Sequence, residues 1–245
     1  MTFSNNIISK ISIVGHAGGK KTGPENSLKA FKRAIELKAD FIEFDVRISK
    51  DNQIVIIHDP DTLNSTGTPG LVKDKTLQEL KKLEIGEGEK IPTFREILEL
   101  TENKINLLLH INASKIEKRV INLLRNYKYI EKTIVSCMVH RYLFNYRILE
   151  PKLKLAALVN LYSEGLPSWE VRKKIVDDAV NSNFYAINPE YHIVDKKFIT
   201  YAHQRKIKVF PWTVNKREDI QYLIDLGVDG IITDDIPLAK ELLGR

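Results

Sequence analysis

Cysteine is almost absent from this chain, since Cys137 is the only one among 245 residues. A single cysteine excludes an intramolecular disulfide, and its place in the apolar run 134–138 is typical of a small buried residue rather than a nucleophile. The chain also has no apolar stretch near the ~20 residues that a membrane-spanning helix needs. The polar N-terminal segment 1–10 lacks the hydrophobic region of a signal peptide. We therefore expect a cytoplasmic protein without a transmembrane segment.

A strong excess of one charge is also missing. Lys and Arg total 38 against 32 for Asp and Glu, a formal net charge of +6. Many lysines lie beside glutamates, as in 81–84, which is typical of a solvated surface. No motif that reads DNA or RNA is present. The expected partner is a small molecule rather than a nucleic acid, and nothing in the sequence indicates an oligomer.

What the chain does have is a regular alternation of apolar strand-like runs and helical patterns. With 43% hydrophobic residues it can bury one large core, so residues 1–245 are expected to form a single domain. Strands that are each followed by a helix predict an α/β fold, and eight of them predict a closed (β/α)8 TIM barrel. The expected strands are 11–15, 41–45, 106–111, 133–136, 154–159, 184–188, 208–213 and 230–233.

The second unit of this barrel carries an addition. The segments 40–48 and 54–57 predict a hairpin with a return strand. Residues 60–90 then form a short insertion, which we expect to be a long loop with one short helix before the helix 93–101.

The hairpin gathers chemically active side chains. A two-residue loop at 51–52 places Asp45 opposite His58, with Glu43 on the same face, although a bulge would shift this register by one residue. Two carboxylates and an imidazole on one face are costly to bury unless a cation or a substrate lies between them. An ion pair with Arg47, which has the same parity as the two acids, is the alternative without a function.

Other polar side chains fall at the carboxyl ends of the predicted strands, where barrel enzymes place their chemistry. His16 ends the first strand, and Trp212 lies near the end of the seventh. His110 and Asn112 follow three leucines at the end of the third, so that both share a face with Leu108.

Several short motifs appear along the chain in a fixed order. They are His16-Ala17-Gly18, Pro24-Glu25-Asn26-Ser27, Glu43-Phe44-Asp45-Val46, His58-Asp59, Trp212-Thr213-Val214-Asn215 and the segment from Asp229 to Pro237. In order and spacing they resemble the motifs of the glycerophosphodiester phosphodiesterase family, a TIM-barrel group related to phosphatidylinositol-specific phospholipase C. The resemblance spans residues 13 to 238.

The resemblance implies a reaction and roles for particular residues. It implies metal-dependent hydrolysis of glycerophosphodiesters to an alcohol and glycerol phosphate, with His16 as the general base and His58 as the general acid. Glu43 and Asp45 would hold a divalent cation, Mg²⁺ or Ca²⁺.

We assign substrate binding to Asn26, Asn112 and Trp212. Helix capping by Asn26 and packing of the barrel mouth by Trp212 are the alternatives.

Three positions depart from the family pattern. Ala17 replaces an arginine, and His110 and Asn112 replace the glutamate and lysine of a Glu-x-Lys motif. If His110 completes the metal site, it favours Mn²⁺ or Zn²⁺, whereas as an imidazolium it would instead hydrogen-bond the phosphate. Lys20 and Lys21 could supply the lost positive charge or be ordinary loop residues.

The departures keep other functions open. A barrel that binds a phosphate ester without turnover, a hydrolase that uses the two histidines without metal, and a lysophospholipase D-like enzyme with a shifted substrate remain alternatives.

Overall fold

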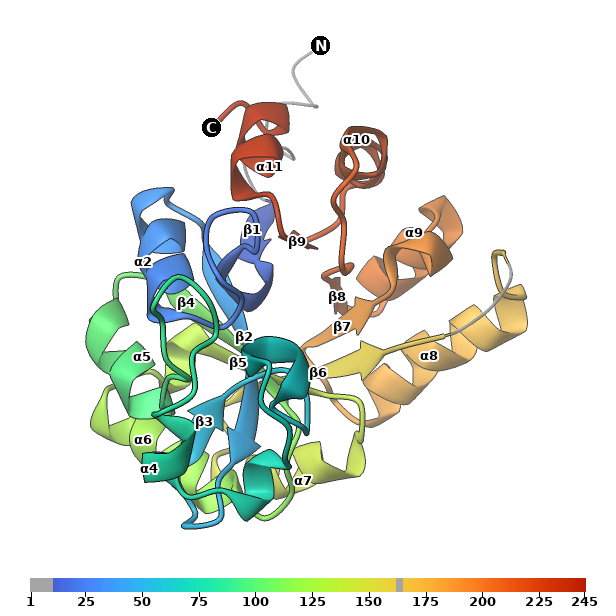
Figure 1. Ribbon diagram of the computed structural model, residues 1–245. Coiled ribbons are helices and arrows are strands. Elements are labelled where there is room, and N and C mark those ends of the chain that lie inside the picture. The colour runs from blue at the N-terminus through green and yellow to red at the C-terminus, as the bar shows by residue number, and fades with distance from the viewer. Residues whose placement is uncertain (1–10, 162–164) are drawn as a thin grey trace.

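The computed structural model describes residues 11–161 and 165–245 (Figure 1). Eight parallel strands form one sheet in the order β8-β7-β6-β5-β4-β2-β1-β9, and β3 pairs only with β2. The strands are β1 Ser12–Gly15, β2 Phe41–Ile48, β3 Ile54–Ile56, β4 Asn106–Ile111, β5 Thr133–Cys137, β6 Lys154–Val159, β7 Ala186–Pro189, β8 Lys208–Val209 and β9 Gly230–Thr233.

Backbone hydrogen bonds join the two ends of this sheet. The Asp229 N–H donates to Val209 O at 3.0 Å, and the Ile232 N–H donates to Pro211 O at 3.0 Å. β8 is shorter than the predicted strand 208–213, in part because Pro211 has no N–H to donate to a ladder. The expected (β/α)8 barrel is confirmed.

A ring of helices covers the outside of the barrel (Figure 1). They are α2 Leu28–Glu36, α5 Phe94–Thr101, α6 Glu117–Asn126, α7 Arg141–Leu149, α8 Trp169–Asn181, α9 Lys196–Gln204, α10 Arg217–Leu226 and α11 Ile236–Leu242. The predicted helix 93–101 is α5, and Thr93 is its N-cap in a capping box with Glu96. None of the helices in the described ranges is long and apolar enough to cross a membrane.

The barrel interior is filled by one apolar layer, to which most strands contribute one side chain. These side chains are Val14, Leu108, Ile134, Ala156, Ala186, Phe210 and Ile232. Gly230 makes room for this layer, since a Cβ there would lie 2.4 Å from the Phe210 ring.

Because side chains alternate along a strand, the residue two positions beyond each layer member also points inward, toward the barrel mouth. Those residues are His16, His110, Ser136, Leu158, Asn188, Trp212 and Asp234. The sequence period of two therefore places a second ring, most of it polar, directly above the apolar one.

The insertion after β3 is more structured than expected. It holds three short helical segments rather than one, α3 Leu63–Thr66, η2 Val72–Asp74 and α4 Leu77–Leu80. Thr76 and Glu79 form a capping box at the start of α4, and Gly67 ends α3 with φ 70°. The insertion packs on the hairpin through an apolar cluster of its own, Val55, Ile57, Val72, Leu80 and Ile91.

The predicted hairpin register is wrong by one residue. Val46 pairs with Ile56, and the Ile57 N–H donates to Asp45 O at 3.1 Å, so Ile57 rather than His58 lies opposite Asp45. The cause is the loop, which has three residues between Ser49 and Gln53, with Asn52 in the left-handed region at φ 61°. His58 therefore lies beyond the end of β3.

Candidate active site

A cavity of about 270 Å³ opens at the carboxyl ends of the strands. The predicted residues His16, Glu43, Asp45, His58, His110 and Trp212 all line it, together with Leu108, Ser136, Met138, Leu158, Asn160, Asn188 and Ile232. His16 and His58 therefore line the same cavity as the two carboxylates. The one-residue shift in register does not remove His58 from the site, since His58 still lines the cavity.

Glu43, Asp45 and His110 form a compact cluster at the bottom of this cavity. One potential ligand atom of each lies within 4.8 Å of the others. Glu43 and Asp45 come from β2 and are 6% and 1% exposed, and His110 comes from the neighbouring strand β4, where it pairs with Asp45. The ladder itself therefore brings the third group to the two acids.

The Asp45 carboxylate is the best-supported group in the cluster. Its Oδ1 accepts from Asn112 Nδ2 at 3.0 Å and lies 2.9 Å from His110 Nδ1, and its Oδ2 accepts from Asn26 Nδ2 at 3.1 Å. Burial acts to raise the pKa of Asp45, but these contacts, that to His110 first, outweigh it and hold the pKa well below its ordinary value. Asp45 is ionised across the physiological range.

Glu43 is in the opposite electrostatic situation. Burial and the neighbouring Asp45 charge raise its pKa, and the charges of His16 and His110 and the N–H of Ala17, 2.9 Å from Oε2, offset this only in part. A buried carboxylate beside another one is stabilised by a bound cation.

His110 has an unused ring nitrogen. The Asp45 carboxylate is an acceptor, so His110 Nδ1 carries the proton in that contact. Nε2 is then free to accept, and this buried atom has no hydrogen-bond partner among the described residues. Two carboxylates and an imidazole whose ligand atoms lie within 4.8 Å of one another are a donor set that fits a divalent cation.

His16 is oriented by a carboxylate from the last strand. Its Nδ1 lies 2.7 Å from Asp234 Oδ1, and Asn215 Nδ2 donates to Asp234 Oδ2 at 2.6 Å. Burial lowers the pKa of His16, but the hydrogen bond to Asp234 and the charges of Glu43 and Asp234 outweigh it, so the pKa is raised overall. His16 Nε2 is left to exchange a proton with a ligand.

His58 has a similar arrangement on a more exposed segment. Its Nδ1 lies 2.7 Å from Asp59 Oδ1, and Asn64 Nδ2 donates to Asp59 Oδ2 at 2.7 Å. The backbone of His58 is also held, because Arg47 donates to its carbonyl oxygen from Nε at 2.8 Å and from Nη2 at 2.6 Å.

Arg47 is therefore not an ion-pair partner of the acids of its own strand. No ion pair between Arg47 and Glu43 or Asp45 occurs in residues 11–161 and 165–245. Its third contact, from Nη1 to Asn112 O at 3.4 Å, connects the His58 segment to the end of β4.

The remaining predicted residues have mixed outcomes. Trp212 lines the cavity and donates from Nε1 to Asn188 O at 2.9 Å. Asn26 and Asn112 are not among the lining residues, and their amides donate to Asp45 instead. Substrate contact by these three side chains stays a prediction.

The two lysines considered as replacements for lost positive charge are both paired. Lys20 Nζ lies 2.5 Å from Glu25 Oε2, and Lys21 Nζ lies 2.8 Å from Asp235 Oδ2. Lys20 remains close enough to the site to lower the pKa of His16.

Asp234, Arg47 and Asn188 support the site in ways that were not predicted from the sequence. Asp234 could have been found from the barrel order, since the last strand must lie beside the first and Asp234 directly follows it. Asn188 lies in β7 and its Oδ1 accepts from Ser136 Oγ at 2.8 Å, which links two residues of the polar ring at the barrel mouth.

Comparison with known proteins agrees with this geometry. The profile of the Glycerophosphoryl diester phosphodiesterase family matches residues 16–238. A glycerophosphodiester phosphodiesterase of Caldanaerobacter subterraneus is 36% identical over 241 residues, covering 92% of this chain and 95% of its own.

Solved structures show the same fold. A putative glycerophosphoryl diester phosphodiesterase of Silicibacter pomeroyi superposes with a TM-score of 0.87 at 22% identity, covering 95% of this chain and 92% of its own. An Oleispira antarctica phosphodiesterase in complex with the product sn-glycerol-3-phosphate superposes with a TM-score of 0.85 at 20% identity, covering 98% and 99%. The match over residues 16–238 and the 36% identity show that this chain belongs to the glycerophosphoryl diester phosphodiesterase family.

Proposed function

We propose that this protein hydrolyses small glycerophosphodiesters to an alcohol and glycerol phosphate, with His16 and His58 as the acid/base pair and a divalent cation at Glu43, Asp45 and His110. The observation that carries the proposal is one cavity in which two carboxylate-oriented histidines adjoin a buried carboxylate cluster. The Oleispira antarctica relative, which binds the product sn-glycerol-3-phosphate, supports the substrate class.

The residues divide the proton transfers as follows. His16 Nε2 takes the proton of the attacking glycerol hydroxyl or water, while Asp234 stabilises the imidazolium that forms. His58 Nε2 gives a proton to the oxygen of the departing alcohol, and Asp59 holds its ring. A cation bound at the cluster would polarise the phosphate and offset the charge on its oxygens.

His110 supports a particular cation preference. With His110 neutral, the cluster has one negative charge fewer than the family's pattern of three carboxylates. An imidazole ligand favours Mn²⁺ or Zn²⁺ over Mg²⁺ or Ca²⁺, whose binding depends on charged oxygen ligands. The lost phosphate-binding arginine and lysine leave the cation and the histidines as the main positive groups for the substrate.

The decisive experiment measures release of glycerol phosphate from glycerophosphocholine, glycerophosphoethanolamine and glycerophosphoglycerol after chelation and re-addition of Mn²⁺, Zn²⁺, Mg²⁺ or Ca²⁺. His16→Ala and His58→Ala should each lower the rate by ~10²–10⁴-fold. His203→Gln is the matched control, because His203 pairs with Asp229 away from the cavity.

Each alternative function predicts a different outcome. Hydrolysis that survives chelation would indicate a metal-free two-histidine enzyme. Binding of glycerol phosphate without turnover of any diester would indicate a phosphate-ester-binding barrel. A lysophospholipid added as a fourth substrate and followed by release of its head group, if it alone is hydrolysed, would indicate a lysophospholipase D-like enzyme.

A further inference from the structure

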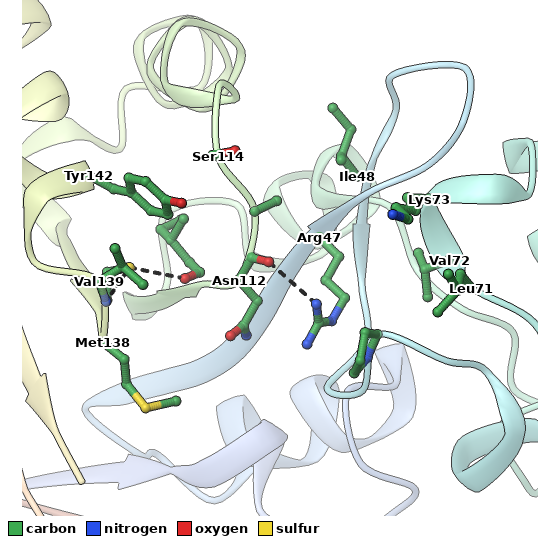
Figure 2. A pocket seen from close by; sticks show the side chains of 14 residues that line it. Arg47, Ile48, Leu71, Val72, Lys73, Asn112, Ser114, Met138, Val139 and Tyr142 are labelled. Carbon is green, nitrogen blue, oxygen red and sulfur yellow. Dashed lines mark hydrogen bonds between the residues drawn. The ribbon is translucent and has the colours of Figure 1, made fainter.

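A second, larger pocket lies beside the active-site cavity. It has a volume of about 570 Å³, within the range of small-molecule sites. Figure 2 shows Met138, Val139 and Tyr142 on one side and Leu71 and Val72 on the other, with Arg47 and Asn112 between them. We call this pocket the side groove.

The side groove adjoins the reacting centre. Met138 lines both the side groove and the active-site cavity. Asn112 lies in the wall of the groove, while its amide donates to Asp45 in the cavity. A ligand that has its phosphate near Asp45 can therefore extend past Met138 without leaving the protein surface.

The groove presents an apolar surface to solvent. Leu71, Met138 and Val139 are 38%, 48% and 40% exposed and gather at this one place. Single exposed apolar side chains are normal, but a group of them beside an active site indicates a binding surface. Lys73 adds a charge at the groove, and its ammonium has no hydrogen bond or ion pair within the described part of the chain.

The groove lies on the His58 side of the site. Pro60, two residues after His58, lines it, and so does Arg47, which holds the His58 carbonyl. His16 is instead tied to Asp234, at the end of β9. In the proposed function His58 protonates the departing oxygen, so the departing alcohol must extend toward the groove.

From this we infer that the side groove binds an apolar chain on the departing alcohol, which makes glycerophosphodiesters of alkyl alcohols the preferred substrates. The inference rests on the proposed function. In the reaction, a P–O bond forms to the attacking oxygen, whose proton goes to His16. The P–O bond to the alkyl alcohol breaks, and its oxygen takes a proton from His58.

A chain-length series tests the inference. Glycerophospho-n-alkanols with methyl, butyl, hexyl and octyl groups, assayed below their critical micelle concentrations with Mn²⁺ present, place the chain on the departing alcohol. Burying methylenes in the groove should raise kcat/KM by up to about fourfold per carbon until the groove is full. A matched series of 1-O-alkyl-glycerophosphocholines places the same chains on the glycerol side and should show no such rise.

Two variants connect the effect to the groove. Val139→Asp should abolish the rise of kcat/KM with the chain length of the departing alcohol, while changing the rate on glycerophosphocholine less than about twofold. Ile148→Asp is the control, since Ile148 is 77% exposed and lies outside the groove, and it should keep the wild-type slope. Circular dichroism and Tm of both variants show whether they are folded.

The outcomes separate the two proposals. A flat series for the wild type, or a rise only with chains on the glycerol side, overturns the groove assignment, while hydrolysis of glycerophosphocholine still supports the proposed function. If no diester is hydrolysed, the proposed function fails. In that case, calorimetric titration of the glycerophospho-n-alkanols into His58→Ala still measures how Kd changes with chain length. A Kd that does not fall with chain length also overturns the inference.

Discussion

Arg47 offers the sharpest test of how His58 acts. Its guanidinium donates to the His58 carbonyl oxygen at 2.8 and 2.6 Å, and these contacts fix the segment that carries the imidazole. We predict that Arg47→Met lowers kcat on alkyl diesters through the loss of this positioning. The thioether side chain keeps much of the apolar stem and removes the donors.

The size of the effect follows from the contacts. A hydrogen bond to a charged group contributes about 1.5–3 kcal/mol, and each ~1.4 kcal/mol of lost transition-state stabilisation is tenfold in rate. Misplacement of His58 should therefore cost roughly 10- to 150-fold in kcat on alkyl diesters. The kcat of Arg47→Lys should lie between those of the wild type and Arg47→Met. An ammonium can still donate to the carbonyl, but it lacks the planar fork that bonds the carbonyl twice.

The assay compares two departing groups with the same metal-loaded protein. The nitrophenyl group of a nitrophenyl diester departs as a stable nitrophenolate anion and needs no proton from His58. Hydrolysis of this diester should therefore be much less affected by Arg47→Met than hydrolysis of glycerophosphocholine. An equal loss on both substrates, or no loss on either, would refute the positioning role. Tm measurements separate either outcome from simple unfolding.

Three further predictions concern β4 and two carboxylates, Asp234 and Asp229. The double substitution His110→Glu, Asn112→Lys introduces the Glu-x-Lys motif that the family resemblance implies. It should lower the calorimetric Kd for Mg²⁺ or Ca²⁺ and raise the turnover of simple glycerophosphodiesters. If Kd and rate are both unchanged, the metal binds elsewhere. Asp234→Asn removes contacts that raise the pKa of His16, so the acid limb of the kcat/KM profile should move to lower pH while the plateau falls by up to ~10⁴-fold, and an unmoved limb would exclude His16 as the base. Asp229→Asn should cost about 1.5 kcal/mol or more of unfolding free energy at pH 7. The pKa of Asp229 is lowered in the folded protein. The difference in unfolding free energy between the wild type and Asp229→Asn should therefore have its full size above the unfolded pKa of Asp, roughly 4. It should disappear in urea titrations at successively lower pH.

The strand-end residues were predictable because one rule places them. Val14, Leu108 and Phe210 belong to the apolar layer of the barrel, and the residues two positions later face the mouth. Apolar runs in the sequence mark the strands, and parity along each run then identifies the inward side chains. His110 follows from this parity, and His16 and Trp212 follow from their positions at the ends of predicted strands.

The errors and omissions have different physical causes. The hairpin register depends on the backbone of a single residue, Asn52, whose positive φ makes the loop one residue longer than expected. The pairing of His16 with Asp234 joins residues 218 positions apart and requires closure of the barrel. Arg47 has the parity of Glu43, but it lies in the part of β2 that pairs with β3, where its side chain reaches the His58 segment.

The two stacked rings inside the barrel have a consequence for protein engineering. The lower ring, which includes Leu108 and Ile134, carries the packing, whereas the upper ring, which includes His110 and Ser136, lines the candidate site together with Glu43, Asp45 and His58. A combinatorial library confined to upper-ring positions would vary ligand set and charge while leaving the hydrophobic interior intact. The scaffold is therefore a starting point for directed evolution, because exchanges at positions such as His110 leave the packing layer below them unchanged.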